Sequence, residues 1–143
     1  MTIDWDAVRA EVTGHLQALI RIVIVNPPGN ETEAANYLAR IAAEAGILHE
    51  VVGGQPGSDN FVARLPGTGG GGPVLLLAHT DVVSVERDRW AHDPFSGELI
   101  DGYVWGRGAV DTKNQVAANL MVLPLLKREG LTLARHAHGR ARR

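Results

Sequence analysis

The stretch of sequence that decides the fold is Val74-Leu75-Leu76-Leu77-Ala78-His79-Thr80-Asp81. The stretch is apolar up to Ala78, and polar side chains follow at once. An unbroken apolar run of this length predicts a β-strand covered on both faces, as in a mixed or parallel sheet flanked by helices. A buried helix segment is the alternative. The short run and the preceding Pro73 favour the strand.

An amphipathic helix is expected at the start of the chain. Apolar residues recur at spacings of three and four from Val8 to Val23, which places them on one side of a helix. Asp4 can cap this helix at its N-terminus. The helix should end before Asn26, because the following Pro27-Pro28-Gly29 cannot continue it.

A second helix and two strands are expected before the apolar run. Asn30 and Glu33 have the spacing of a capping box that opens a helix, and Gly46 has the usual position of a glycine that closes one. Residues 48–52 and 60–65 are rich in β-branched and apolar side chains, which predicts two strands joined by a turn.

The chain after the apolar run predicts a hairpin and a third helix. Residues 98–100 and 103–105 flank Asp101-Gly102, a strong signal for a two-residue hairpin turn. Residues 112–127 have a helical pattern, in which Pro124 predicts a kink or an early end. Helices and strands therefore interleave, which predicts an α/β fold with a mixed, mostly parallel sheet flanked by helices, and the length suits one domain.

Composition excludes several functions. The formal charge is -2 at pH 7, so no broad basic surface is expected for nucleic acid or an anionic membrane. The chain has no cysteine, which leaves His, Asp and Glu as its strong metal ligands. No long apolar segment suggests a secretory signal or a membrane span. We expect a soluble, cytoplasmic protein whose partner is a small molecule or a peptide.

Two acidic segments carry the candidate chemistry. His79 and Asp81 follow the apolar strand, at the edge where open α/β sheets bind their ligands. Asp81 can orient one ring nitrogen of His79 while the other faces a cation. His79 can equally be a hydrogen-bonded polar residue at a strand end. Asp111 stands among glycines just before a helix, where a metal-binding carboxylate and a plain N-cap are both open interpretations.

The region from Val74 to Asn119 resembles the co-catalytic zinc metallopeptidase family of acetylornithine deacetylase, succinyl-diaminopimelate desuccinylase, aminoacylase and carboxypeptidase G. Several linked motifs carry this resemblance in the right order. They are Leu75-Leu76-Leu77-Ala78-His79-Thr80-Asp81-Val82-Val83, Trp90, Asp93-Pro94-Phe95-Ser96-Gly97, Asp101-Gly102-Tyr103-Val104-Trp105-Gly106-Arg107-Gly108, Asp111-Thr112-Lys113 and, near the start, Asn26-Pro27-Pro28-Gly29-Asn30-Glu31.

The resemblance implies roles for individual residues. His79 would bind one zinc ion, Asp111 would bridge two zinc ions, and Asp81 would orient His79 in the catalytic site. Co²⁺ or Mn²⁺ are alternatives to Zn²⁺. The resemblance also implies a cis peptide bond between Asp111 and Thr112. The reaction implied is metal-assisted hydrolysis of an amide in an N-acyl amino acid or small peptide, with a glutamate of a later Glu-Glu pair as the base.

The sequence departs from the family pattern near its C-terminus. We interpret residues 1–135 as the N-terminal portion of such a catalytic domain, with residues 131–135 beginning its next strand. Residues 136–143 are basic and lack an apolar period, so we expect a disordered or out-of-frame tail. The Glu-Glu pair does not follow, nor do the later regions to which the family's substrate specificity and dimer surface belong.

The small number of metal ligands in this sequence determines what function we expect. Two protein ligands are too few for two zinc ions, so we expect the chain alone to bind zinc weakly and to lack hydrolase activity. The same gap should leave an unpaired sheet edge. A non-catalytic fragment or binding module with the α/β scaffold is the main alternative. A serine acyl-enzyme is disfavoured, because Ser58-Asp59-Asn60 lacks its companion motifs.

Overall fold

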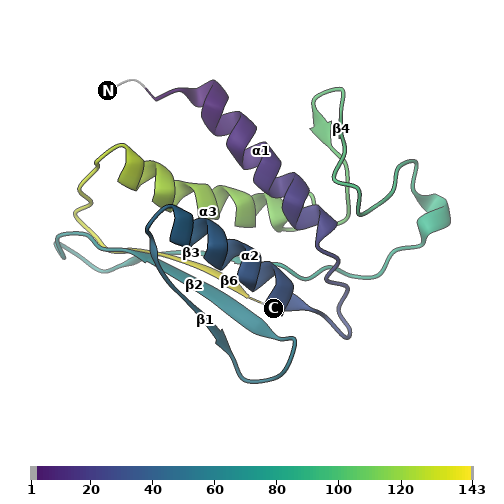
Figure 1. Cartoon of the computed structure of the whole chain (residues 1–143), viewed down its shortest axis with the longest axis horizontal. Coiled ribbons are helices and arrows are strands. Elements are labelled where there is room, and N and C mark those ends of the chain that lie inside the picture. Colours follow the sequence, from purple (N-terminus) through teal and green to yellow (C-terminus); the bar gives the residue numbers. More distant parts are fainter. Residues whose placement is uncertain (1–2, 143) are drawn as a thin grey trace.

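A computed structural model describes residues 3–142 of the chain. In this region helices and strands interleave along the sequence, as the α/β expectation requires (Figure 1). The elements are α1 (Trp5–Arg21), α2 (Glu31–Glu44), β1 (Leu48–Gly53), β2 (Asp59–Leu65), β3 (Val74–His79), the 3-10 helix η1 (Arg87–Arg89), β4 (Leu99–Ile100), β5 (Tyr103–Val104), α3 (Lys113–Arg128) and β6 (Ala137–Arg142).

The main sheet has four strands in the order β1-β2-β6-β3. β6 pairs antiparallel with β2 and parallel with β3, and β1 pairs antiparallel with β2. The sheet is therefore mixed, as expected. Most of its pairings are antiparallel, however, so the expectation of a mostly parallel sheet is corrected. β4 and β5 form a separate small hairpin.

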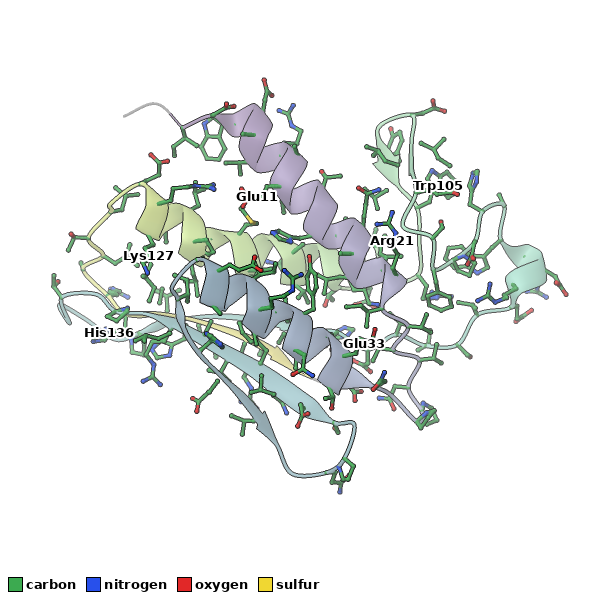
Figure 2. All side chains as sticks on the ribbon, viewed as in Figure 1. Glu11, Arg21, Glu33, Trp105, Lys127 and His136 are labelled. Carbon is green, nitrogen blue, oxygen red and sulfur yellow. The ribbon has the colours of Figure 1, made fainter. Side chains whose placement is uncertain are left out.

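The helices form two further layers on one side of this sheet (Figure 1). α2 contacts β1 and β2, α3 contacts β3 and β6, and α1 packs on α3. Figure 2 shows Glu11 on the side of α1 that faces α3, where its carboxylate pairs with Arg128 at 3.1 Å. The core lies between the sheet and α2 and α3. Its buried members include Leu38, Phe61 and Leu120.

The first two helices begin and end close to where the sequence predicts. The Asp4 side chain accepts hydrogen bonds from the backbone N–H groups of Asp6 and Ala7, so it caps α1 as expected. Gly46 follows α2 with φ +63°, the left-handed conformation that favours glycine. At the start of α2, Asn30 makes no side-chain cap bond to the backbone and instead donates to the Glu33 carboxylate. The reciprocal capping box is therefore absent.

The most important difference from the sequence expectation is β6. Residues 137–142 form a strand between β2 and β3, so the expectation of a disordered tail is wrong for them. Ala137, Gly139 and Ala141 alternate with polar residues, and this period of two suits a strand with one buried face. The two alanines are buried in the core. The strand expected at residues 131–135 is absent, because regular pairing starts only at residue 137.

A second correction concerns β3. The sequence predicts a strand covered on both faces, yet the side chains of Leu75 and Leu77 are 58% and 46% exposed. β3 is the last strand of the sheet, and α1, α2 and α3 lie on the other face (Figure 1). Only Ala78 on this strand is buried. The apolar run thus forms a strand, as predicted, but only one of its two faces is covered by helices.

The remaining elements match the sequence in type. The β4–β5 hairpin turns at Asp101 and Gly102, both with positive φ, as the sequence predicts. α3 continues past Pro124 to Arg128, so the early end predicted at this proline is wrong. Within residues 3–142, no helix has the length and hydropathy needed to cross a lipid bilayer.

Candidate metal centre

His79, the last residue of β3, lies between two carboxylates. Its Nδ1 atom is 3.1 Å from Oδ1 of Asp81 and 3.1 Å from the backbone oxygen of Asp81. Its Nε2 atom is 3.1 Å from Oδ1 of Asp111, a residue 32 positions later in the sequence. The three side chains expected at the site therefore come together. Nδ1 can donate to either Asp81 acceptor, and a ring protonated there can present the lone pair of Nε2 to a cation shared with Asp111.

The carboxylates of Asp81 and Asp111 differ in how far they are exposed to solvent. The Asp81 side chain is 22% exposed, whereas the Asp111 side chain is 84% exposed. The Asp81 carboxylate is thus held inside the protein surface beside His79. The Asp111 carboxylate is open to solvent on the other side of the ring, where a cation could approach both it and Nε2.

The backbone around Asp111 is tied to the end of β3 through Thr112. The Thr112 hydroxyl donates to the backbone oxygen of His79 at 3.0 Å and accepts from the backbone N–H of His79 at 3.2 Å. The Asp111–Thr112 peptide bond is cis, as the resemblance implies. Thr112 is also the N-cap position of α3, so the interpretation of Asp111 as a plain N-cap is not what the structure shows.

Glycines allow the loop before Asp111 to pack closely against its surroundings. A Cβ atom on Gly106 would lie 2.4 Å from Cγ2 of Ile20, and one on Gly108 would lie 2.6 Å from Cγ1 of Val82. Gly108 also has φ +82°, which favours glycine. Any larger residue at these positions would push the loop away from α1 and from the end of β3, and would displace Asp111.

Lys113 anchors the start of α3 beneath the site. Its side chain is fully buried, and Nζ donates to the backbone oxygens of Leu19 and Ile22 at 2.8 Å each. Burial lowers the pKa of Lys113 to about 8, and the Asp81 carboxylate opposes this effect. Lys113 therefore joins the C-terminal end of α1 to the helix that follows Asp111.

Asn26 is a further polar residue at the site that sequence reasoning did not assign a role. Its side-chain amide donates to Oδ2 of Asp81 at 3.1 Å. The motif that contains Asn26 resembles a family loop, but a partner 55 positions away in the sequence cannot be read from a loop motif. Thr112 and Lys113 were missed as supporting residues for the same reason.

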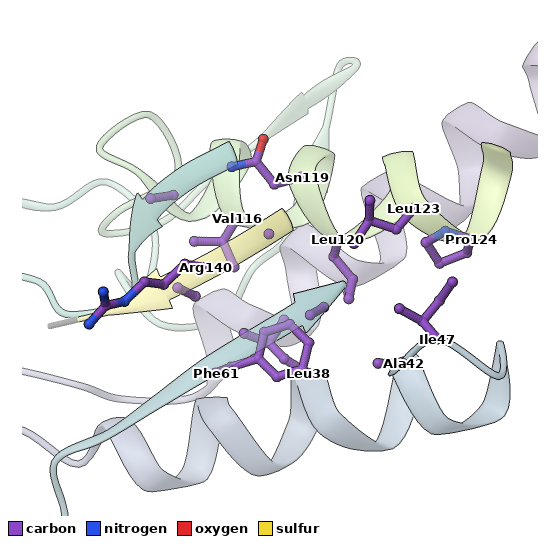
Figure 3. Close-up of a pocket in the computed structure, with 14 residues that line it drawn as sticks. Leu38, Ala42, Ile47, Phe61, Val116, Asn119, Leu120, Leu123, Pro124 and Arg140 are labelled. Atoms are coloured by element: carbon purple, nitrogen blue, oxygen red, sulfur yellow. The ribbon is translucent and has the colours of Figure 1, made fainter. Parts of the chain in front are cut away.

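Two hollows in the structure differ in character. An open hollow of about 270 Å³ is bordered by His79, Asp81, Asp111 and the loop from Gly106 to Val110. It could admit a small molecule to the face of His79 and Asp111. The other is an apolar cavity of about 20 Å³ in the core between α2, α3 and the sheet, which none of these three residues borders (Figure 3). The first hollow is the one relevant to chemistry at His79.

The number of metal ligands is small. Across the described part of the chain, no group of three or more His, Asp or Glu side chains is arranged to hold a metal ion. His136 and His138 do not join the site; the ring of His136 instead accepts a hydrogen bond from the backbone of Gly67. The structure therefore offers one imidazole and one exposed carboxylate, with Asp81 behind the imidazole.

Comparison with known proteins agrees with the resemblance seen in the sequence. The profile described as peptidase family M20/M25/M40 matches residues 75–138. The succinyl-diaminopimelate desuccinylase of Methylorubrum populi is 44% identical over 120 residues, which cover 79% of this chain and 30% of that protein. Aminoacylase-1 of Sus scrofa is 37% identical over 121 residues, covering 83% of this chain and 30% of its own length. This chain thus spans about 30% of the length of these relatives.

A solved structure shows the same fold. The M20 family metallo-carboxypeptidase of Sulfolobus solfataricus superposes with a TM-score of 0.80 at 20% sequence identity. The similarity covers 92% of this chain and 30% of that protein. The three helices and the mixed sheet described above therefore have the fold of part of that protein.

Proposed function

We propose, from the match of residues 75–138 to the profile of peptidase family M20/M25/M40, that His79 and Asp111 are the first protein ligands of a two-zinc centre that hydrolyses amide bonds. The observation that carries the proposal is the 3.1 Å distance between Nε2 of His79 and Oδ1 of Asp111. The proposed substrates are N-acyl amino acids or small peptides, the classes that the names of the relatives suggest.

The donor atoms fit a zinc ion. Zinc accepts imidazole nitrogen and carboxylate oxygen, and the chain has no cysteine to compete with them. A histidine ligand must present an unprotonated nitrogen, and the ring of a metal-bound histidine usually donates its other N–H to a carboxylate or carbonyl. Both acceptors are present on the Nδ1 side of His79. Co²⁺ and Mn²⁺ also accept these donors.

Each of the three site residues has a distinct part in the proposed chemistry. Asp81 keeps the proton on Nδ1 of His79 and fixes the ring plane, so that Nε2 points toward Asp111. Asp111 can use its two carboxylate oxygens to bridge two cations. Zinc ions bound there would supply Lewis-acid chemistry, namely polarisation of the amide carbonyl and a lower pKa for water. The open hollow beside Val110 gives a small substrate access to these groups.

The ligand count limits what this chain does alone. The sequence contains no Glu-Glu pair, which the resemblance assigns to the general base and a further ligand. We therefore expect weak zinc binding and no hydrolysis by residues 1–143. The same observation favours the second candidate function, a non-catalytic fragment or binding module that keeps the α/β scaffold.

Zinc titration of the purified chain tests the proposal. We expect weak binding by calorimetry in the wild type and its loss in His79→Ala and Asp111→Ala, because each substitution removes one of the two donors. His92→Ala is the matched control. His92 lies 3.8 Å from Glu98 at the hairpin and does not border the site, so this variant should bind zinc like the wild type.

Two results would count against the proposal. Unchanged zinc binding in His79→Ala would show that any bound metal lies elsewhere, and the metal site would be refuted. Rapid zinc-dependent hydrolysis of N-acyl amino acids by the wild-type chain would refute the expectation that two ligands are insufficient. That activity would also decide against the binding-module alternative.

A further inference from the structure

We propose that Asn26 is a positioning residue of this centre, whose amide orients the Asp81 carboxylate and through it the His79 ring. The proposal rests on the proposed function, since it concerns the same histidine. Asn26 contacts Asp81, and the face of His79 concerned is the one that looks toward Asp111. Its effect on that face is transmitted through Asp81.

The contacts form a chain of two hydrogen bonds through one carboxylate. Asn26 Nδ2 donates to Oδ2 of Asp81 at 3.1 Å, while Oδ1 of Asp81 lies 3.1 Å from Nδ1 of His79. The two bonds use different oxygens, so the carboxylate is held from both ends and cannot rotate without losing one of them. A carboxylate bonded only to His79 could turn freely and follow the ring. Asn26 thus converts a flexible acceptor into a fixed one.

The backbone places Asn26 beside Asp81 independently of their side chains. The N–H of Asn26 donates to the oxygen of Val82 at 2.9 Å, and the N–H of Val82 donates to the oxygen of Ile24 at 2.8 Å. Val25 and Val82 form a parallel bridge. The segment after α1 is therefore joined to the segment after β3 in a fixed register. This register sets Asn26 next to the acidic residue that precedes Val82.

An uncharged donor suits this position. A second carboxylate at residue 26 would repel Asp81, whereas an ammonium group would compete with His79 for its charge. Lys113 already provides a buried cation whose charge interacts with Asp81. The amide adds direction to the Asp81 carboxylate without adding charge. Removal of the carboxylate directly behind a metal-binding histidine typically changes metal affinity by about 10- to 100-fold, so removal of the group that orients this carboxylate should reach the lower part of that range.

The experiment compares Asn26→Ala and the isosteric Asn26→Asp with a matched control, Asn30→Ala. Asn30 lies in the same loop and also donates to a carboxylate, that of Glu33 at 3.0 Å, but it makes no contact with the site. The first measurement is the tautomer of His79 in the metal-free chain, from its ring ¹⁵N chemical shifts at alkaline pH. The second is zinc affinity by calorimetry.

We expect both Asn26 variants to lose Nδ1–H tautomer population at His79 and to bind zinc about tenfold more weakly or worse. Asn30→Ala should change neither quantity. A merely structural role for Asn26 would lower thermal stability without moving the tautomer. The proposal is overturned if folded Asn26→Ala and Asn26→Asp keep the wild-type tautomer and zinc affinity.

A further measurement covers the case in which the Asn26 variants do not fold. If neither variant folds, the test uses the wild-type chain. On zinc addition the side-chain amide resonances of Asn26 should shift and those of Asn30 should not. Unchanged Asn26 amide resonances would refute the proposal. If the wild-type chain does not bind zinc at His79, the proposed function fails. The tautomer comparison in metal-free protein then still supports or refutes the orienting role of Asn26.

Discussion

At the scale of single residues, Lys113 makes the strongest polar connection under the site. It is a fully buried cation that donates to two backbone oxygens at the end of α1. Replacement by methionine keeps most of the apolar stem and removes both donors. It would leave the oxygens of Leu19 and Ile22 without this partner, and a bond from a charged group contributes about 1.5–3 kcal/mol.

We therefore expect Lys113→Met to lower the free energy of unfolding by about 2–4 kcal/mol, measured by urea denaturation. Lys127→Met is the matched control. Lys127 also donates to a backbone oxygen near a helix end, that of Gly46, but it is exposed. Its loss should cost less than about 1 kcal/mol, because water replaces the lost bond. Equal effects of the two substitutions would show that burial does not strengthen the bonds of Lys113.

The three side chains that come together at the candidate site could be named from the sequence, and the residues behind them could not. His79, Asp81 and Asp111 stand in motifs that resemble those of a metallopeptidase family, and that resemblance implies their roles. Asn26 and Lys113 act on partners 55 and 91 to 94 positions away. Such contacts depend on how α1, β3 and α3 meet in space. Without the fold, neither residue differs visibly from an ordinary loop or helix residue.

At the scale of secondary-structure elements, β6 fits loosely beneath the helices. Its buried face carries only Ala137, Gly139 and Ala141, and the apolar cavity of about 20 Å³ borders Gly139 and Ala141. In Figure 3 the side chains of Leu120 and Leu123 extend from α3 into this cavity. Small residues on β6 thus leave space that larger side chains on a central strand would fill.

Gly139→Ala should therefore stabilise the protein. A Cβ atom at this position would lie 3.7 Å from Cδ1 of Leu123, which is ordinary contact. Glycine in a strand interior costs about 0.5–1 kcal/mol relative to alanine, so we expect the free energy of unfolding to rise by about that amount. Thermal and urea denaturation would measure the gain.

The control for this prediction is Gly67→Ala. A Cβ atom on Gly67 would lie 2.2 Å from the backbone oxygen of Arg135. That clash cannot be relieved by moving a side chain, so this variant should be less stable than the wild type. A destabilised Gly139→Ala would show that β6 is tightly packed and that the cavity is not available to a methyl group.

The elements differ in how well the sequence predicts them, and the reason is physical. α1 and α2 carry strong local signals, an apolar stripe and end signals at Asp4 and Gly46, and both appear as predicted. β6 has no apolar residue larger than alanine, so a search for apolar periodicity passes over it. Its stability comes from pairing with β2 and β3 on both sides. A strand that is stabilised by backbone pairing with its neighbours, and not by large apolar side chains of its own, is hard to predict from one sequence.

At the scale of the whole molecule, the sheet has one covered and one bare face. Leu75 and Leu77 of the edge strand β3 are exposed on the face without helices, and residues 74–78 carry no charge. An uncharged, apolar edge strand with free backbone groups is able to pair with another chain. We expect the wild-type chain to self-associate as its concentration rises, as measured by sedimentation velocity.

Leu77→Glu should reduce this association. A charge within an edge strand opposes pairing with a second copy, and Leu77 lies across from Arg140 on β6, which can accommodate a carboxylate. Val83→Glu is the control, because Val83 is 65% exposed but lies outside the strands. Equal association in the wild type and Leu77→Glu would show that β3 is not the contact.

The place of β6 in the sheet also orders the assembly of the protein in time. β1 and β2 are adjacent in sequence and can pair as soon as they are made, but β3 has no partner among the strands that precede it. It remains unpaired until synthesis has passed through α3 and reached residues 137–142. During translation the apolar strand that ends in His79 therefore stays unpaired after β1 and β2 have paired. In this interval chaperones or wrong partners can bind it.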